Sequence, residues 1–297
     1  MKIFYFFLLF LISNSLFSQK EVNLTYNIRN NETYIITTEI SSESIQEIAS
    51  SPQNVSSRQN IIYTLSFAKD KSSSNYSLLL KFKNITSEIN QSGYKQIFNS
   101  DSSNNKISKI FQNFLTKHLS YQLTEHGKII PLYSVNKLFA DSSENKQKYI
   151  FSQSVEQKIK ANLPVSIIFP LKPIRIGDSW HVPDTLISGI FNFYNKSYTL
   201  DSVSKTEYYI TENNDFSSDN NNLIPMNRVF VSYDVKGKTK SNYILNKKSC
   251  IIKSAYIKQT GSGNLYMRYT KKSDPAYTWK MTINNIVEFK SKKLITD

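Results

Sequence analysis

The segment Ile174–Asp184, IRIGDSWHVPD, holds residue types that could do covalent chemistry. Ser179 could act as a nucleophile, His181 as its base, and Asp184 as the acid that orients the base. Pro183, however, disrupts a strand just before Asp184, and known triads are assembled from distant segments of a chain. In a nucleophile elbow a second glycine would stand where this chain has His181. We therefore expect no catalytic residue here, and a serine hydrolase is the least favoured alternative.

A structural interpretation of the same segment is more economical. Gly177 and Asp178 have the composition of a tight turn, in which Ser179 or Asp178 bonds the backbone. Trp180 then opens a strand and buries a large apolar area. The predicted site is thus a structural one, made of Gly177, Asp178, Ser179 and Trp180.

Metal, disulfide and cofactor chemistry find little support in the composition. The chain of 297 residues has one cysteine, Cys250, and three histidines. One cysteine cannot form an intramolecular disulfide, and no histidine has a metal-ligand partner at a useful spacing. We expect no metal, no cofactor and no enzymatic activity.

The first residues predict export. Lys2 precedes the apolar run Ile3–Ile12, and a short polar stretch with small residues follows up to Ser18. This is the layout of a secretory signal peptide. The run is shorter than the about 20 residues that span a bilayer, although an uncleaved anchor is the alternative. We expect a signal peptide over 1–18 and an exported β-rich domain over 19–297. The domain would be periplasmic or extracellular, with outer-membrane association open.

The formal net charge is +14. Such a surface attracts anionic lipid head groups, acidic polysaccharides or nucleic acid. The lysines are spread along the chain, and no nucleic-acid motif is present. We expect a solvated basic surface, with a lipid, an anionic envelope surface or an envelope protein as partner. No nucleic-acid partner and no transmembrane span in the mature chain are expected.

Alternating apolar residues predict a chain rich in β-strands. Tyrosine and phenylalanine are frequent, at 19 and 18 residues, whereas glycine is rare at 7. The predicted hairpins are 22–40 around Asn30 and Asn31, 60–68 with 76–84, and 197–202 with 207–211. A meander follows over 227–236, 240–246, 250–260, 264–271 and 279–290. The polar segment 212–222 is expected to be a loop, and the polar segment 41–57 is expected to be mobile.

One segment has helical spacing. In 106–119, apolar residues recur at positions three and four apart, which places them on one stripe. We expect a helix that packs on an open sheet face, and 135–163 is expected to be partly helical. The predicted apolar helix face consists of Ile107, Ile110, Phe111, Phe114 and Leu115.

Two pairs of segments look alike. Arg29–Tyr34 is similar to Arg175–Trp180, and Tyr121–Ile130 is similar to Tyr243–Ile252. Chance similarity between hairpins and duplication of a unit both explain this. The predicted fold is mainly β, with large curved antiparallel sheets and one to three packing helices. Two duplicated half-barrel units, about 19–134 and 165–297, would be joined by a partly helical segment.

Pro170–Trp180 resembles the segment P-x-K-P-V-x-V-G-D-S-W of an uncharacterised family of exported proteins from Gram-negative bacteria. Pro170, Lys172, Pro173 and Gly177–Trp180 match, and Ile174 and Ile176 are conservative replacements. The family has no assigned activity, so the resemblance implies no site residue. Its pattern is remotely similar to periplasmic lipoprotein carriers, in which a curved antiparallel sheet surrounds an apolar cavity.

Together these features predict a non-enzymatic exported protein of the cell envelope. The favoured function is binding of a hydrophobic or amphipathic ligand, or of an envelope partner. The alternative is a structural or interaction module in which side chains fill both faces of the sheets. An empty apolar cavity would favour the first, and a solid core the second.

Overall fold

The structure, a computed structural model, describes residues 20–48, 51–91, 93–102, 108–109, 112, 115–116, 118–133, 163–182, 186–188, 191–218, 221, 223–226 and 229–294. The predicted signal peptide, Asp184 and most of 135–163 lie outside these residues. The described strands are β1 (Thr33–Ile48), β2 (Ser51–Lys69), β3 (Tyr76–Gln91), β4 (Tyr94–Asn99), β5 (His118–Leu123), β6 (Ile129–Tyr133), β7 (Ser179–Val182), β8 (Leu186–Ser188), β9 (Phe191–Val203), β10 (Glu207–Ser218), β11 (Ile224–Met226), β12 (Val229–Asn246), β13 (Ile252–Arg268) and β14 (Tyr277–Leu294).

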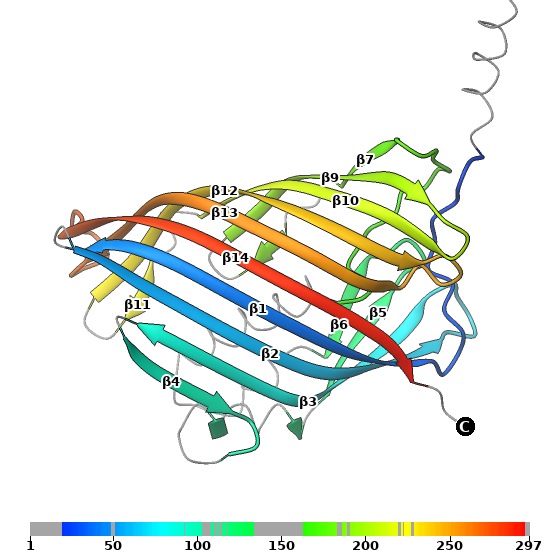
Figure 1. Cartoon of the computed structure of the whole chain (residues 1–297), viewed down its shortest axis with the longest axis horizontal. Coiled ribbons are helices and arrows are strands. Elements are labelled where there is room, and N and C mark those ends of the chain that lie inside the picture. Colours follow the sequence, from blue (N-terminus) through cyan, green and yellow to red (C-terminus); the bar gives the residue numbers. More distant parts are fainter. Residues whose placement is uncertain are drawn as a thin grey trace, which may run out of the picture.

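All of these strands belong to one antiparallel sheet. Its order is β6-β5-β3-β2-β1-β14-β13-β12-β10-β9-β7, with β4, β8 and β11 paired to β3, β9 and β12. Most neighbours are consecutive in the chain, which is the simplest connection for antiparallel strands. The long pairing of β1 with β14, from Thr33 opposite Leu294 to Gln46 opposite Met281, joins the two halves of the chain (Figure 1).

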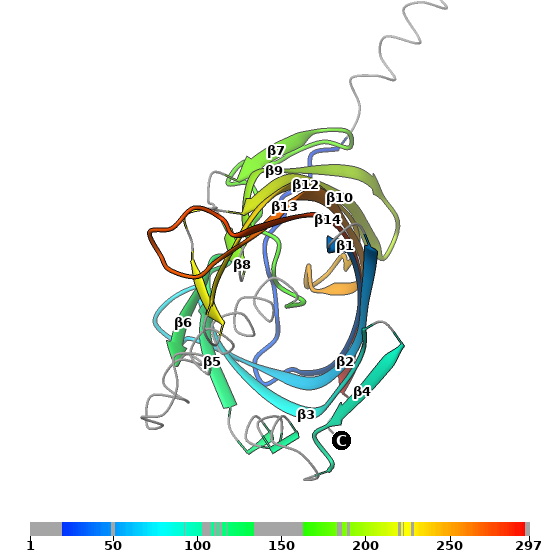
Figure 2. The same ribbon diagram turned by 90° about the vertical axis from the view of Figure 1, so that its left-hand side faces the viewer.

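The sheet curves strongly, so that it has a concave and a convex face (Figure 2). Strand residues alternate between the two faces because successive side chains point in opposite directions. In β3 the residues Tyr76, Leu78, Leu80 and Phe82 are buried, whereas the residues between them are exposed. The buried set faces the concave side, where it packs with the other strands.

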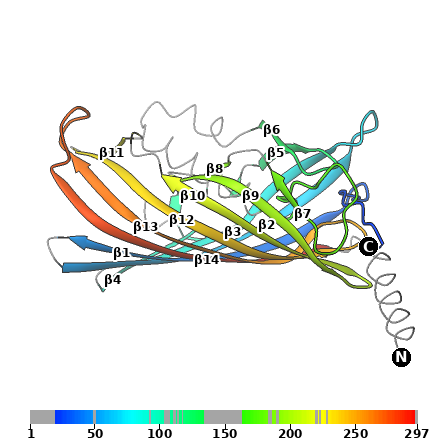
Figure 3. The same cartoon turned by 90° about the horizontal axis from the view of Figure 1, so that it is seen from above.

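One end of the concave face holds the large apolar core. Two segments outside the strands run inside the curve, namely 20–32 and 163–174 (Figure 2). Leu24, Tyr26 and Ile167 are at most 2% exposed and belong to this core. Tyr26 also donates its hydroxyl to the Ile167 carbonyl at 3.0 Å. We call the half of the sheet that packs on segments 20–32 and 163–174 the closed end. The other half, which includes β11 and the hairpin between β13 and β14, is the far end (Figure 3).

The predicted strand at 22–28 is therefore wrong. This segment makes one isolated bridge, Val22 with Ile174, and otherwise fills the core. Its alternation arose because Leu24, Tyr26 and Ile28 point into the apolar interior, a pattern that an extended core segment and a strand share. The hairpins of β2 with β3 and of β9 with β10 are confirmed.

The predicted loop at 212–222 is also wrong over most of its length, and the polar segment 41–57 lies almost entirely in strands. In 41–57, β1 continues to Ile48 and β2 begins at Ser51. In 212–222, β10 continues to Ser218. The meander consists of three long strands, because β12 and β13 continue through the predicted breaks. Polar residues are typical of turns, but in these segments they occupy regular positions of the strand ladders.

The helix prediction is only partly described. Ser108, Lys109, Gln112 and Leu115 are helical, and Leu115 packs against the large core. Ile107, Ile110, Phe111 and Phe114 lie outside the described residues. Leu119, the last residue of the predicted helix 106–119, belongs to β5. The mainly β, curved and antiparallel class is confirmed, but one sheet replaces two half-barrel units. Within the described ranges, no helix has the length and hydropathy to cross a membrane.

Candidate functional site

The predicted turn at Gly177 is built by backbone hydrogen bonds. Gly177 has a φ of 90°, a left-handed value that favours glycine. Its N–H donates to the Leu200 carbonyl at 2.7 Å, and the Leu200 N–H donates to the Asp178 carbonyl at 3.1 Å. The Asp178 carboxylate accepts the Arg175 N–H at 2.8 Å. The acid thus bonds the backbone of the turn.

Ser179 and Trp180 begin β7. The Ser179 hydroxyl shares a hydrogen bond with the Thr199 hydroxyl at 2.8 Å. Trp180 is 8% exposed, stacks on Tyr198 at 5.3 Å between ring centroids, and donates its indole N–H to the Ile168 carbonyl at 2.8 Å. His181 is exposed on the same face as Ser179. The residues therefore connect the edge of the sheet to the core segment 163–174.

The turn at Asn31 repeats this geometry. Asn31, with a φ of 63°, donates its N–H to the Phe67 carbonyl at 2.9 Å, and the Phe67 N–H donates to the Glu32 carbonyl at 2.9 Å. The Thr33 hydroxyl shares a 2.9 Å hydrogen bond with the Ser66 hydroxyl. These contacts match those of Gly177, Asp178 and Ser179 one for one. Duplication of a whole unit stays a prediction, because the likeness concerns two turns.

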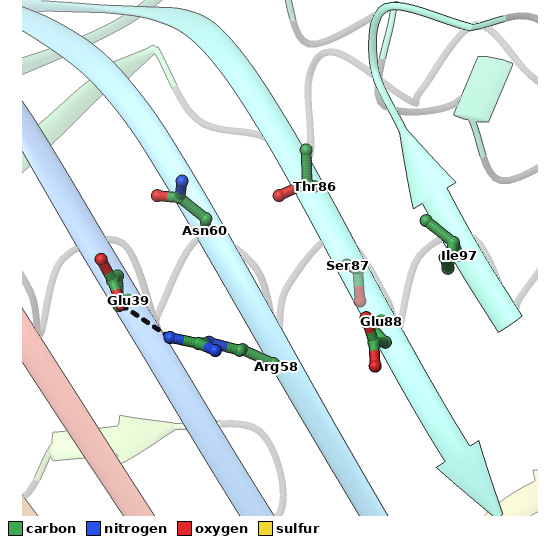
Figure 4. Close-up of a pocket in the computed structure, with 7 residues that line it drawn as sticks. All are labelled: Glu39, Arg58, Asn60, Thr86, Ser87, Glu88 and Ile97. Atoms are coloured by element: carbon green, nitrogen blue, oxygen red, sulfur yellow. Dashed lines mark hydrogen bonds and ion pairs between the residues drawn. The ribbon is translucent and has the colours of Figure 1, made fainter. Parts of the chain in front are cut away.

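A shallow hollow of about 300 Å³ lies on the convex face. It is lined by Glu39, Arg58, Asn60, Thr86, Ser87, Glu88 and Ile97 from β1 to β4. Arg58 points toward Glu39, and the two form an exposed ion pair at 3.4 Å (Figure 4). Glu88 pairs with Lys95 at 2.8 Å. Because these charges pair in solvent, the hollow is best explained as a solvated surface.

A buried polar cluster on the concave face is the most unusual chemistry of the described residues. The Glu212 carboxylate lies in β10, and its side chain is 4% exposed. It accepts hydrogen bonds from Lys196 at 3.2 Å, from the Asn214 amide at 2.9 Å and from the Tyr243 hydroxyl. Lys196 lies beside a register shift of β9 and also contacts the Tyr198 ring at 5.4 Å.

Burial and charge act in opposite directions in this cluster. Burial, the largest single influence, lowers the pKa of Lys196. The charge of Glu212, the interaction with Tyr243 and the hydrogen bond to Glu212 together outweigh burial, so this pKa is raised. Burial, followed by the charge of Glu212, raises the pKa of Tyr243 well above its ordinary value. Lys196 therefore stays charged, and Tyr243 stays a neutral donor. A buried pair of this kind needs each partner, because an isolated buried charge is costly.

A second, smaller apolar cluster lies on the concave face of the far end. Its buried members are Phe216, Val231, Val235, Leu265, Met281 and Ile283, and Val229, Tyr233 and Trp279 pack against it. Phe216 lies so close to Gly237 that a Cβ there would stand 2.4 Å from the ring. Gly237 thus leaves room for an aromatic ring inside a strand, which is why it does not end β12.

Cys250 lies at the closed end, outside this cluster. It is 3% exposed, and burial raises the pKa of its thiol to about 12. Since the thiolate is the reactive form, the thiol is inert at neutral pH. Among the residues that the structure describes, His, Cys, Asp and Glu form no group of three or more that could hold a metal ion.

The sequence interpretation missed the Glu212 cluster entirely. Glu212 and Asn214 lie in a segment whose composition predicts a loop. The signal was present, because Glu212, Asn214, Phe216 and Ser218 continue the period of two that Tyr208 and Ile210 begin. Composition concealed it, since five of the seven residues from Glu212 to Ser218 are Asn, Asp or Ser.

Comparison with known proteins gives a family and a fold. A model described as a family of unknown function (DUF6263) matches residues 73–252. No curated protein matches the chain. A solved structure of lipovitellin, concerned with lipid–protein interactions, aligns with a TM-score of 0.54 at 10% identity, covering 91% of this chain and 26% of that chain. An outer membrane channel from Pseudomonas putida aligns with a TM-score of 0.29 at 6% identity, covering 90% and 97%.

The lipovitellin likeness concerns the fold alone, since 10% of residues are identical. This chain spans about a quarter of the lipovitellin chain that it matches. The family match agrees with the expectation of a family without an assigned activity. The P-x-K-P-V-x-V-G-D-S-W motif falls within the matched residues, and its connection with the family stays a prediction.

Proposed function

The chain belongs to this family of unknown function, and from its geometry we propose that it is an exported, non-enzymatic envelope protein that binds an amphipathic lipid. The concave face of the far end is the binding surface. The small apolar cluster on that face carries the proposal, because it lines the curve separately from the large core.

The shape of the sheet supports this function. A curved sheet presents one continuous inner surface on which a long acyl chain can lie along several strands. Val235, Leu265 and Met281 come from three adjacent strands and share that surface. Small-molecule sites are typically concave and mostly apolar, with a few polar groups that orient the ligand. The fold similarity to lipovitellin, described together with lipid–protein interactions, points to the same ligand class.

A structural or interaction module is the second candidate, and the closed end favours it. There the strands pack on Leu24, Tyr26 and Phe169, with Tyr26 and Phe169 rings 4.7 Å apart. This end has the solid core that a module without a ligand would need. The two candidates therefore differ in whether the far end binds a lipid.

The hairpin between β13 and β14 supports contact with an anionic envelope surface. Residues 266–280 carry four basic side chains against one acid. Tyr269 is 59% exposed and Tyr277 is 48% exposed, and Lys271 contacts the Phe230 ring at 5.7 Å. Aromatic and basic residues together suit the interface of an anionic bilayer. Vesicles with phosphatidylglycerol should sediment the protein at low salt, and neutral vesicles should not.

Lipid extraction and dye binding test the proposal. Protein purified from envelopes without detergent should release a stoichiometric lipid in mass spectrometry, and delipidated protein should bind an apolar fluorescent dye. Ile283→Ala should weaken dye binding about three- to tenfold, the loss expected from removing buried apolar area. Ile45→Ala is the matched control, because Ile45 lies on the neighbouring strand and is 48% exposed on the convex face. Wild-type protein that carries no lipid and binds no dye would contradict the function.

A further inference from the structure

A row of polar side chains crosses the concave face between the two apolar clusters. Direct antiparallel pairs link β10, β12, β13, β14, β1 and β2 without a register shift along the row. Residues paired in this way share a face of the sheet. We call them the polar row, which consists of Asn214, Thr239, Gln259, Asn285, Ser42 and Ser57.

Apolar residues flank part of the polar row on each side. On β10 and β12 its closed-end neighbours are the polar Glu212 and Ser241, and on β1 its far-end neighbour is Ser44. Toward the closed end, Ile257, Val287 and Ile40 occupy the next inward positions of β13, β14 and β1, and all are buried. Toward the far end, Phe216 and Ile283 belong to the small apolar cluster. A sheet that only needed a solid core would continue apolar through the middle, because burying polar groups costs free energy unless they are bonded.

Three polar atoms lie at the β10 and β12 end of the row and are unpaired within the part of the chain that the structure describes. The Asn214 Oδ1, the Thr239 hydroxyl and the neighbouring Ser241 hydroxyl are buried without a hydrogen-bond partner among the described residues. The three residues are 7%, 4% and 0% exposed. The orientation of Asn214 is chemically determined, because a carboxylate only accepts and the Asn214 amide must donate to Glu212. The Asn214 Oδ1 is therefore the side-chain atom that lacks a hydrogen-bond partner among the described residues.

The charge of this end is balanced. Lys196 and Glu212 pair with each other, so the three unpartnered atoms face no net charge. A charged ligand group would lack a counterion here, whereas a neutral group with hydroxyls could both donate to Asn214 and bond the Thr239 and Ser241 hydroxyls. The rest of the row, including Gln259 and Asn285, is only half-buried, which gives a ligand its approach.

We infer that the polar row binds the uncharged, hydroxyl-bearing head group of an amphipathic lipid, with the acyl chain on the small apolar cluster. This inference rests on the proposed function and specifies its ligand class. The alternation of an apolar patch and a polar row on one concave face matches the two parts of such a molecule.

Two probes separate head-group binding from chain binding. 1-Monooleoylglycerol and methyl oleate share an acyl chain and an ester, but only the first has hydroxyls. The double variant Thr239→Val/Ser241→Ala should bind monooleoylglycerol about tenfold more weakly, the loss expected from two neutral hydrogen bonds. Its affinity for methyl oleate should change less than about twofold by the same reasoning. The matched control is Thr260→Val, because Thr260 is exposed on the convex face.

Thermal melting distinguishes a binding role from a structural one. Removing unpartnered buried hydroxyls should leave the Tm of the ligand-free double variant unchanged or raise it. Unchanged affinity for monooleoylglycerol, or equal losses for both probes with a lowered Tm, would overturn the inference and leave the proposed function standing. Failure of wild-type protein to bind either probe would instead overturn both.

Discussion

The closed end and the far end of the sheet use the same long strands for different purposes. At the closed end, β1 places Tyr34, Ile36 and Ile40 on the concave face, where core segments cover them. Beyond Ile40 the same strand places Ser42, Ser44 and Gln46 there. The strand does not end at the change of composition, because backbone pairing with β14 and β2 continues. Most of the buried apolar residues thus lie at the closed end, and the proposal assigns lipid binding to the far end.

Breaking the buried ion pair should give the largest effect. Lys196→Met leaves the Glu212 carboxylate buried without its cation, which should cost about 3–5 kcal/mol of unfolding free energy. Chemical denaturation measures this loss, and adding Glu212→Gln should restore most of it. Lys253→Met is the control, since Lys253 forms an ion pair with Glu207 at the surface and should lose less than about 1 kcal/mol. Equal losses at both sites would contradict the buried cluster.

Substitution of a leucine should affect mainly the unfolding free energy at the closed end, and dye affinity as well at the far end. Leu65→Ala removes a side chain that is 0% exposed in the large core and should cost about 2–5 kcal/mol, with dye affinity unchanged. Leu265, 6% exposed in the small cluster, should give a smaller loss of stability together with weaker dye binding. Denaturation and dye titration on both variants check this division, and the reverse pattern would refute it.

The two matching turns at the closed end should respond alike. Ser179→Ala and Thr33→Ala each remove one hydroxyl–hydroxyl bond to a neighbouring strand. Each change should therefore lower the unfolding free energy by about 0.5–1.5 kcal/mol. A loss at one turn alone would show that the likeness of their hydrogen bonds has no energetic counterpart.

Labelling of Cys250 should show how often the closed end opens, and it needs no substitution in the protein. Its pKa is raised to about 12 by burial, so its contribution to stability is present below the ordinary thiol pKa. That contribution is lost as the pH rises toward 12, because the unfolded chain deprotonates first. At pH 9 a thiol reagent should label the folded chain about a hundredfold or more slowly than the unfolded chain. Fast labelling would show that this end opens.

The class of fold could be predicted from sequence, whereas the candidate site could not. Apolar alternation in Tyr63–Phe67 and Tyr76–Phe82 marks strands because one face of each is buried. The same rule fails at Asn214, Thr239 and Ser42, where the composition of the polar row is typical of a loop. The strand register determines the row, since Ser42 meets Asn285 only through pairing across more than 200 residues of chain. Single-sequence patterns do not encode that pairing.

Photolabelling with a monoacylglycerol that carries a diazirine in its acyl chain tests the central claim most directly. Mass spectrometry of the labelled peptides locates the chain. The account predicts label on concave residues of the far end, such as Val235, Leu265 and Met281, and competition by unlabelled monooleoylglycerol. Label confined to the convex face, or to the closed-end segments 20–32 and 163–174, would contradict it.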